Sequence, residues 1–161
     1  MTPPLSVAAT LSVSPARDEA ERRAAFALRR EVFVGEQGVR PEAEFDAYDR
    51  TATHLVARLG ADEVVVGALR WRVAAPGVGK VERVVVRRDL RGSRIGVALM
   101  DVVLAELTVA GLAEAVLNAQ LAVQTFYERL GFAAEGPVFE EEGIAHVRMR
   151  RPLADAGVVP R

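Results

Sequence analysis

The sequence contains no cysteine, and its 161 residues include only two histidines. A chain without cysteine forms no disulfide bond, builds no thiolate zinc site and has no cysteine nucleophile. Its apolar runs are also short. Stretches such as Val64–Val66 and Val84–Val86 fall far below the roughly 20 residues that span a bilayer. The N-terminus lacks the basic patch and apolar run of a secretory signal, so we expect a cytoplasmic protein with no membrane partner.

Neither sign of charge dominates, since 21 basic and 22 acidic residues give a formal net charge of −1. Non-specific binding of nucleic acid needs a concentrated positive field, so this balance argues against a nucleic-acid partner. Half of the residues are hydrophobic and 27% are charged, which excludes a disordered chain. The length predicts one domain over residues 1–161, with a core at about 5–151 and a C-terminal tail at 152–161.

Hydrophobic patterning predicts the order of the secondary-structure elements. Strands are expected over residues 5–13, 53–59, 63–74, 80–87 and 113–119, followed by a hairpin over 132–150 that turns near Glu142–Gly143. Helices are expected over residues 16–34, 95–110 and 121–130, the first capped by Ser14 or Asp18 and ended at Gly35. The acidic stretch 35–50 reads as a loop or a short broken helix. This order predicts a mixed α/β fold, with a mostly antiparallel central sheet and helices on both faces.

A basic loop that contains glycine separates a buried strand from the helix predicted at 95–110; it reads Arg91, Gly92, Ser93, Arg94, Ile95, Gly96. The unpaired amides and the dipole of a helix N-terminus favour an anion. Glycine lets the backbone approach a phosphate, and the two arginines can add charge-assisted contacts. An ordinary loop with surface arginines is the alternative. The spacing matches neither a Walker loop nor the Rossmann fingerprint.

This loop resembles the acetyl-CoA loop of the GNAT acetyltransferase superfamily, Arg/Gln-x-x-Gly-x-Gly/Ala, with Arg94 in place of the middle glycine. This departure is tolerable if Arg94 keeps a helical backbone, which needs no positive φ; its side chain would crowd the phosphate more than glycine does, or else pair with it. The segment Tyr127–Phe132 resembles the family's Tyr-Glu-Lys-x-Gly-Phe, and Gln120 stands where relatives often carry asparagine. Likeness to the ElaA/YjcF-like branch of the superfamily covers about residues 26–150, and is carried by residues 30–37, 46–54 and 139–146.

The resemblance implies a GNAT-like sheet and direct transfer of an acyl group from acetyl-CoA to a primary amine of a small molecule or peptide. It assigns the six loop residues, together with Gln120 and Phe126, to the coenzyme. The pantetheine arm would run along Val84, Val85 and Val86, and the two central strands would splay apart in a V to admit it. The backbone amide of Val84 would then face the thioester oxygen.

The resemblance also assigns Tyr127 the task of protonating the departing thiolate. A phenol can do so because its pKa of about 10 lies above that of a thiol. The alternative is that Tyr127 and Phe126 are only aromatic residues that face the core. No group of histidines and acids has the spacing of metal ligands, so we predict no metal.

The base that accepts the amine proton has two candidates. Glu82 lies two residues before Val84, so strand alternation would place both side chains on one face. Its alternative role is a salt bridge with Arg83 or Lys80. His146 follows the hairpin turn and carries an imidazole that titrates near neutrality. Its alternative role is that of a hydrogen-bonded structural residue.

The acidic stretch is expected to line the entrance for the acceptor, as the resemblance implies. Glu36, Gln37, Asp46 and Asp49 would form an acidic rim that attracts a cationic amine, and a solvated loop is the alternative. His54 has the same two interpretations as His146, and Trp71 either packs on the sheet or walls a pocket. Two other functions stay open, namely a CoA-binding sensor without turnover and transfer of a longer acyl chain. A homodimer is also left open, because no stripe of residues specifies an interface.

Overall fold

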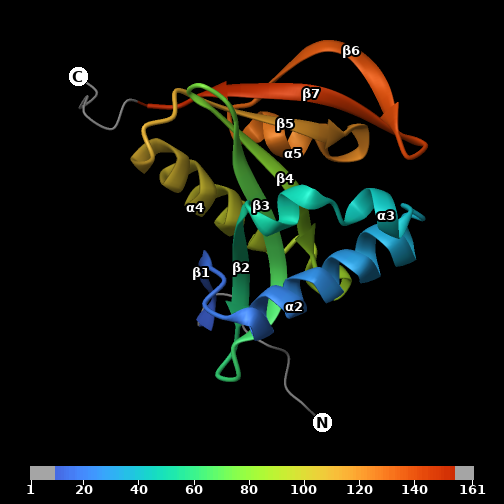
Figure 1. Ribbon diagram of the computed structural model, residues 1–161, viewed down its shortest axis with the longest axis vertical. Coiled ribbons are helices and arrows are strands. Elements are labelled where there is room, and N and C mark those ends of the chain that lie inside the picture. The colour runs from blue at the N-terminus through green and yellow to red at the C-terminus, as the bar shows by residue number, and fades with distance from the viewer. Residues whose placement is uncertain (1–9, 155–161) are drawn as a thin grey trace. The chain divides into compact units, whose positions relative to one another are not determined.

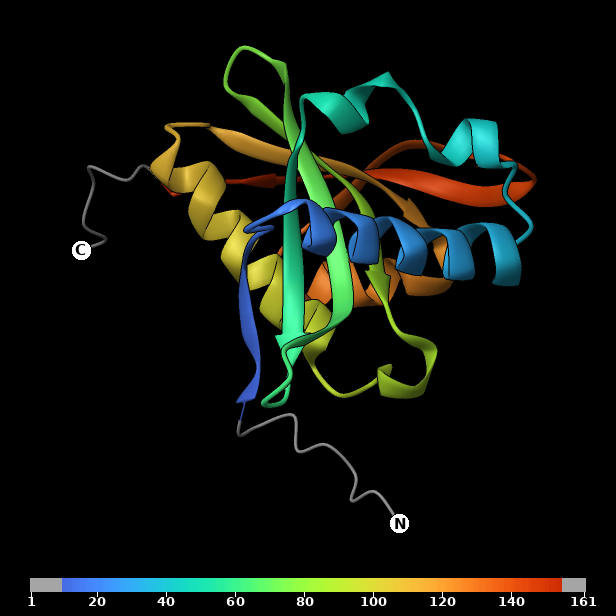
Figure 2. The same ribbon diagram turned by 60° about the horizontal axis from the view of Figure 1, so that its bottom comes forward.

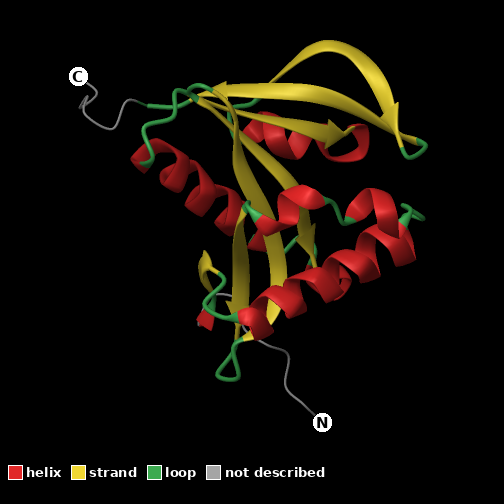
Figure 3. Ribbon diagram, in the orientation of Figure 1, coloured by secondary structure: helices red, strands yellow, loops and turns green. Residues whose placement is uncertain are grey.

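The computed structural model describes residues 10–154 and has the order of elements that the sequence predicts (Figures 1 and 3). Its strands are β1 (Ser12–Pro15), β2 (Thr53–Leu59), β3 (Val64–Ala75), β4 (Val78–Val86), β5 (Glu114–Gln120), β6 (Ala133–Glu141) and β7 (Ile144–Pro152). The α-helices are α2 (Glu19–Arg29), α3 (Pro41–Glu44), α4 (Ile95–Val109) and α5 (Gln124–Arg129). The π-helical turn η1 (Arg30–Glu36) and the 3₁₀ turns η2 (Ala47–Arg50), η3 (Arg88–Leu90) and η4 (Leu121–Val123) lie between them.

The strands form one seven-stranded sheet in the order β1-β2-β3-β4-β5-β7-β6. β1 pairs with β2, β5 with β7 and β6 with β7 in antiparallel fashion, while β4 and β5 are parallel. The prediction of a mixed α/β fold with a mostly antiparallel sheet is confirmed. The parallel register runs only from Val78–Glu114 to Lys80–Val116, although β4 has nine residues and β5 seven.

The chain divides into two compact units, each with buried apolar residues of its own. The first unit consists of Met1–Arg70 and Arg83–Val103, and the second of Trp71–Glu82 and Leu104–Arg161. The single domain expected over residues 1–161 stays a prediction. None of the described helices is long and apolar enough to cross a membrane.

Helices cover both faces of the sheet in the first unit. One face carries α2, whose Leu28 joins Val56 and Ala68 in a buried cluster (Figure 2). On the neighbouring residue Gly67, a Cβ would lie 3.0 Å from side-chain atoms of both Ile95 and Leu99 of α4. Successive residues of a strand point to opposite faces, so α2 and the first half of α4 lie on opposite sides of β3. Gly67 permits this close approach because it has no side chain.

The first predicted helix, expected over residues 16–34, begins later, at Glu19, and also ends at a different residue. Asp18 caps its start by accepting a hydrogen bond from the Glu21 amide at 2.9 Å, as predicted. The predicted end at Gly35 is wrong, because the helix continues through the π-turn to Glu36, and the left-handed residue is Gly38, with φ of 72°. The predicted strand 5–13 is described only at its end, where β1 runs from Ser12 to Pro15; residues 5–9 lie outside the described part.

The second unit contains the hairpin and the short helix that the sequence predicts. β6 and β7 turn at Glu142 and Gly143, whose φ angles of 51° and 74° suit a tight hairpin turn. The register of β5 with β7 places Gln120 opposite His146, and the two strands lie side by side (Figure 1). α5 is followed by Gly131, with φ of 89°, which ends the helix as predicted.

Candidate active site

The loop that precedes α4 contains two left-handed residues. Gly92 has φ of 84° and Arg94 has φ of 70°, directly before α4 begins at Ile95. Arg94 therefore does not meet the condition of a helical backbone under which the departure from glycine costs nothing. Arg94 adopts the conformation for which glycine is the usual residue, and an L side chain pays about 1–2 kcal/mol for it. The sequence departs from the family motif here, and the backbone at Arg94 is left-handed although the residue is not glycine.

Backbone amides of this loop lack acceptors. In the part of the chain that the structure describes, the amides of Gly92, Arg94 and the three residues 95–97 donate no hydrogen bond. The first helical bond runs from the Ala98 amide to the Arg94 carbonyl at 3.0 Å. The amides of Arg91 and Ser93 turn inward, to the carbonyls of Arg88 at 3.5 Å and Leu90 at 3.3 Å. Free amides at a helix N-terminus form a site for an anion.

Arg91 of this loop is paired with Glu36. Its Nη1 and Nη2 donate to the two carboxylate oxygens at 3.1 and 2.6 Å, and its Nε donates to the Val86 carbonyl at 3.3 Å. Arg88 adds a longer ion pair with Glu36, at 3.7 Å. The hydrogen bond from Arg91 lowers the pKa of Glu36. Glu36 therefore lies beside the loop at residues 91–96. Arg91 and Arg88 balance the charge of its carboxylate.

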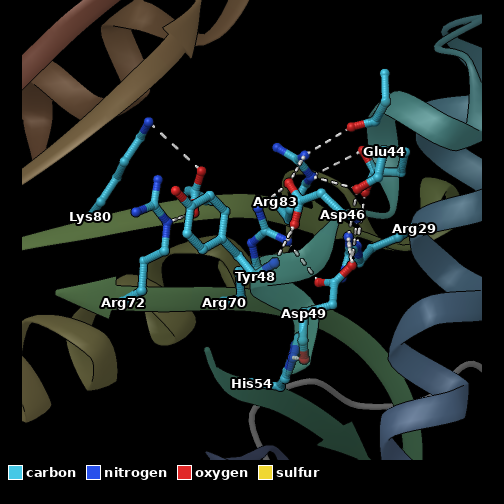
Figure 4. A network of polar contacts seen from close by, with 12 residues as sticks. Arg29, Glu44, Asp46, Tyr48, Asp49, His54, Arg70, Arg72, Lys80 and Arg83 are labelled. Carbon is cyan, nitrogen blue, oxygen red and sulfur yellow. Dashed lines mark hydrogen bonds and ion pairs between the residues drawn. The ribbon is translucent and has the colours of Figure 1, made fainter. Parts of the chain in front are cut away.

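A network of three arginines and three acids lies in the first unit. Figure 4 shows Glu44, Asp46 and Asp49 converging on Arg29, Arg70 and Arg83. We call these six residues the ionic network. It joins helix α2 and strands β3 and β4 to the segment that holds α3 and η2.

Arg29 and Arg70 form the buried part of the ionic network, with exposed fractions of 1% and 0%. Nη1 of each donates to the same oxygen of Asp49, both at 2.7 Å. Arg29 Nε also donates to Glu44 at 2.8 Å, and Arg70 binds both oxygens of Asp46 at 2.7 and 2.9 Å. Buried charges are tolerated only when paired in this way.

The electrostatic balance of the ionic network keeps its aspartates ionised. Burial would raise the pKa of Asp49, but hydrogen bonds from Arg29 and Arg70 outweigh it and lower that pKa to about 2. Burial would raise the pKa of Asp46 as well, but Arg70 and Arg83 outweigh it, and the pKa of Asp46 is lowered. For Glu44, burial is the larger effect and raises the pKa.

The expected acidic rim is therefore a set of ion pairs. Asp46 and Asp49 face arginines of the ionic network, and Glu36 faces Arg91. The sequence could not show this pairing, because the arginines lie 20 or more positions from these acids along the chain. Arg70 gave the only signal, as a charged residue directly after the apolar run at residues 64–69.

Aromatic rings surround Arg29. Its guanidinium carbon lies 5.1 Å from the ring centre of Phe26 and 5.0 Å from that of Phe45, distances typical of cation–π contacts. His54 packs edge-on against Phe26, and its Nε2 donates to the Asp49 carbonyl at 2.8 Å. Burial lowers the pKa of His54, which keeps the imidazole neutral. In this geometry His54 supports the ionic network.

Tyr127 lies in the second unit, on α5, with 7% of its surface exposed. Phe126 and Phe132 pack edge-on against its ring, with centroids 5.0 and 6.0 Å away. Burial raises the pKa of the Tyr127 hydroxyl, so it stays protonated at neutral pH. Both the packing role and the proton-donor role remain compatible with this environment.

The two candidate bases also lie in the second unit. Glu82 accepts a hydrogen bond from Arg72 Nε at 2.8 Å and lies 3.8 Å from Lys80 Nζ. Arg83, between Glu82 and Val84, has φ of 60°, outside the range of a regular strand, and the expected alignment of Glu82 with Val84 stays a prediction. Trp71 donates from Nε1 to Glu106 at 2.9 Å.

His146 lies at the start of β7 and is 8% exposed. Its Nδ1 lies 2.7 Å from the Ile144 carbonyl, which can only accept, so the proton sits on Nδ1 and Nε2 keeps its lone pair. Glu141 is 3.9 Å from Nε2, and the ring stacks on Phe139. No group of three or more acids and histidines among residues 10–154 is arranged to hold a metal ion.

Comparison with known proteins identifies the family. The model of the acetyltransferase (GNAT) domain matches residues 17–153. The chain belongs to the GNAT acetyltransferase family. The uncharacterized N-acetyltransferase YjcF of Bacillus subtilis (strain 168) is 34% identical over 137 residues, which cover 84% of this chain and 96% of YjcF. The protein is thus an acyltransferase.

Solved structures agree with this assignment. An acyl-CoA N-acyltransferase from Pseudomonas aeruginosa is 30% identical, with a TM-score of 0.74 over 88% of this chain and 98% of its own. ElaA from Escherichia coli is 27% identical, with a TM-score of 0.75 over 88% and 97% of the two chains. Together with YjcF, ElaA places the chain in the ElaA/YjcF-like branch of the family.

Proposed function

We propose that this protein is an acetyl-CoA-dependent N-acetyltransferase that acts on a primary amine of a small molecule or peptide. The observation that carries the proposal is the group of acceptor-free amides at Gly92, Arg94 and residues 95–97. These donors, with the guanidinium groups of Arg91 and Arg94 nearby in the chain, suit the diphosphate of coenzyme A.

The family resemblance extends the donor site along β4. The pantetheine arm would pair with the backbone of Val84, Val85 and Val86, and the Val84 amide would donate to the thioester oxygen. The short register of β4 with β5, which ends at Lys80, supports this interpretation because an added strand needs unpaired backbone. Ser93, Gln120 and Phe126 complete the proposed coenzyme contacts.

The proposed reaction is a direct transfer. The amine nitrogen attacks the thioester carbonyl carbon, the C–S bond breaks, and the thiolate takes a proton from Tyr127. A buried phenol with a raised pKa remains protonated until the thiolate leaves, which suits this role. The tyrosinate then regains its proton from solvent, and the amine proton passes to a base.

His146 is the stronger of the two candidate bases. Its Nε2 lone pair can accept a proton, and the Glu141 carboxylate lies 3.9 Å from it. The Glu82 carboxylate is already engaged by Arg72 at 2.8 Å and lies 3.8 Å from Lys80 Nζ. Glu36 and Gln37 remain the proposed contacts of the acceptor amine. His54 would not touch the amine; it would help to hold Asp49 of the ionic network in place.

Titration calorimetry with acetyl-CoA, followed by a thiol-release screen against polyamines, amino acids and peptides, tests the proposal. Saturable binding and release of coenzyme A with an amine are expected. Tyr127→Phe should leave binding unchanged and reduce turnover at least tenfold. Arg23→Ala, at an exposed position of α2, is the matched control. Absence of acetyl-CoA binding would refute the proposal, and binding without turnover of any amine would point to a sensor.

A further inference from the structure

Arg83 has an unusual backbone conformation for its place in the fold. Among the described residues other than glycine, four have positive φ: Glu63, Arg83, Arg94 and Glu142. Arg83 alone of these lies inside a strand, β4, with φ of 60°. L residues persist in this region only where the surrounding structure holds them there.

The side chain of Arg83 is held by the end of helix α3. Its Nε donates to the Glu44 carbonyl at 3.1 Å, and its Nη2 donates to the Ala43 carbonyl at 3.2 Å. Nε and Nη2 also pair with the carboxylates of Glu44 and Asp46, at 3.2 and 3.3 Å. Carbonyls in the last turn of a helix have no partner within it, so the guanidinium caps α3.

The groups that hold Arg83 are themselves fixed by buried arginines. Arg70 binds Asp46 with two hydrogen bonds, and Arg29 binds the Glu44 carboxylate at 2.8 Å. Figure 4 shows these side chains meeting at Arg83. A guanidinium with four contacts to fixed partners cannot follow a movement of β4, so its position constrains the backbone that carries it.

We propose that Arg83 is a positioning residue for acyl transfer. Its side-chain contacts with Glu44 and Asp46, which we call the tether, maintain the left-handed turn that orients the Val84 amide. The proposal rests on the proposed function, in which that amide stabilises the thioester oxyanion. A left-handed residue rotates the peptide group that follows it away from the direction of a regular strand. Arg83 lies outside the loop at 91–97, so its loss should affect the chemical step and leave coenzyme binding intact.

Three substitutions distinguish the effect of losing the tether from the effect of changing the backbone conformation at residue 83. Arg83→Ala removes the tether and leaves a Cβ that disfavours positive φ. Arg83→Gly removes the tether but adopts positive φ freely. Arg83→Lys keeps a cation but offers one nitrogen in place of the forked guanidinium. The exposed substitution Arg23→Ala again serves as the control.

The variants are compared by kcat and KM at saturating acetyl-CoA, by calorimetric Kd for acetyl-CoA and by thermal unfolding. Arg83→Ala should lower kcat 10- to 100-fold with Kd changed less than twofold, since loss of one oxyanion donor costs about 100-fold or more. Arg83→Gly should recover at least part of that loss, and Arg83→Lys should fall between. An unchanged kcat in Arg83→Ala would overturn the proposal, even if the variant melts earlier.

A spectroscopic measurement decides the case in which no amine is turned over. In ¹⁵N-labelled protein, the Val84 amide resonance should differ between the acetyl-CoA and CoA complexes, and Arg83→Ala should abolish that difference while both ligands still bind. An equal difference in Arg83→Ala would refute the positioning role. Failure of the wild-type protein to bind acetyl-CoA would instead refute the proposed function.

Discussion

The carboxylate of Glu36 and the guanidinium of Arg91 form a two-point ion pair, with N–O distances of 3.1 and 2.6 Å. This geometry resembles the way a guanidinium binds two oxygens of a phosphate. In the proposed function, a diphosphate would bind the face of Arg91 that Glu36 contacts in this structure. An anionic donor and the Glu36 carboxylate should compete for the same cation.

This competition predicts that Glu36→Gln binds acetyl-CoA more tightly than the wild-type protein. The amide removes the competing charge, and an improvement of about threefold in Kd is expected at low salt, because exposed ion pairs are weak. Calorimetry at two ionic strengths measures it. Glu42→Gln, at an exposed acid of the same stretch, should change nothing. Weaker binding by Glu36→Gln would show that Glu36 orients Arg91 for the ligand instead.

The left-handed conformation of Arg94 predicts opposite effects of one substitution on stability and on binding. Arg94→Gly should raise the free energy of unfolding by about 1 kcal/mol, because glycine has no Cβ to strain at φ of 70°. It should also weaken acetyl-CoA binding severalfold by removing a cation from the diphosphate site.

Urea unfolding and calorimetry measure the two effects of Arg94→Gly. Arg94→Lys retains both the charge and the strained conformation, and should therefore resemble the wild-type protein in each measurement. The explanation by backbone strain would be wrong if Arg94→Gly were less stable than Arg94→Lys.

The pH profile of turnover should identify the base. His146→Ala should lower kcat/KM at least tenfold at pH 7 and by less than threefold near pH 9.5, because a free amine needs no base. Glu82→Gln should cause a smaller loss that does not depend on pH, since Glu82 is engaged with Arg72. The reverse pattern would assign the base to Glu82. Kinetics over pH 6–10 with one amine distinguish the two.

The lowered pKa of Asp49 predicts a loss of stability in acid. This pKa is about 2 in the folded chain and about 3.9 when unfolded, so the unfolded state takes up the proton first. Stability from Asp49 is complete above pH 4 and is lost as the pH falls toward 2. The loss is on the order of 1 kcal/mol, after allowance for screening by solvent.

Carboxyl ¹³C resonances of Asp49 followed over pH 1.5–5 measure its pKa directly. Urea unfolding over the stable part of that range measures the accompanying loss of stability. An aspartate in an unstructured model peptide, which titrates near 3.9, is the second aspartate of the comparison. Equal midpoints for the two aspartates would contradict the prediction.

The sequence predicts the elements well where local patterning determines them. Asp18 caps α2 and Gly131 follows α5 because capping is a local interaction. Prediction fails where distant residues decide the outcome. Arg70 and Arg83 neutralise acids that look free in the sequence. Gly35 was expected to end a helix that instead adds a π-turn.

The division of the chain into two units limits how it can be divided into fragments or cleaved by a protease. Three elements, β3, β4 and α4, each pass from one unit to the other, at residues 70–71, 82–83 and 103–104. Each unit consists of two separate stretches of sequence, and any continuous fragment that contains one whole unit also contains part of the other. Neither half can therefore be expressed as a continuous fragment, and a protease that nicked the chain within any of these three elements would damage both units at once.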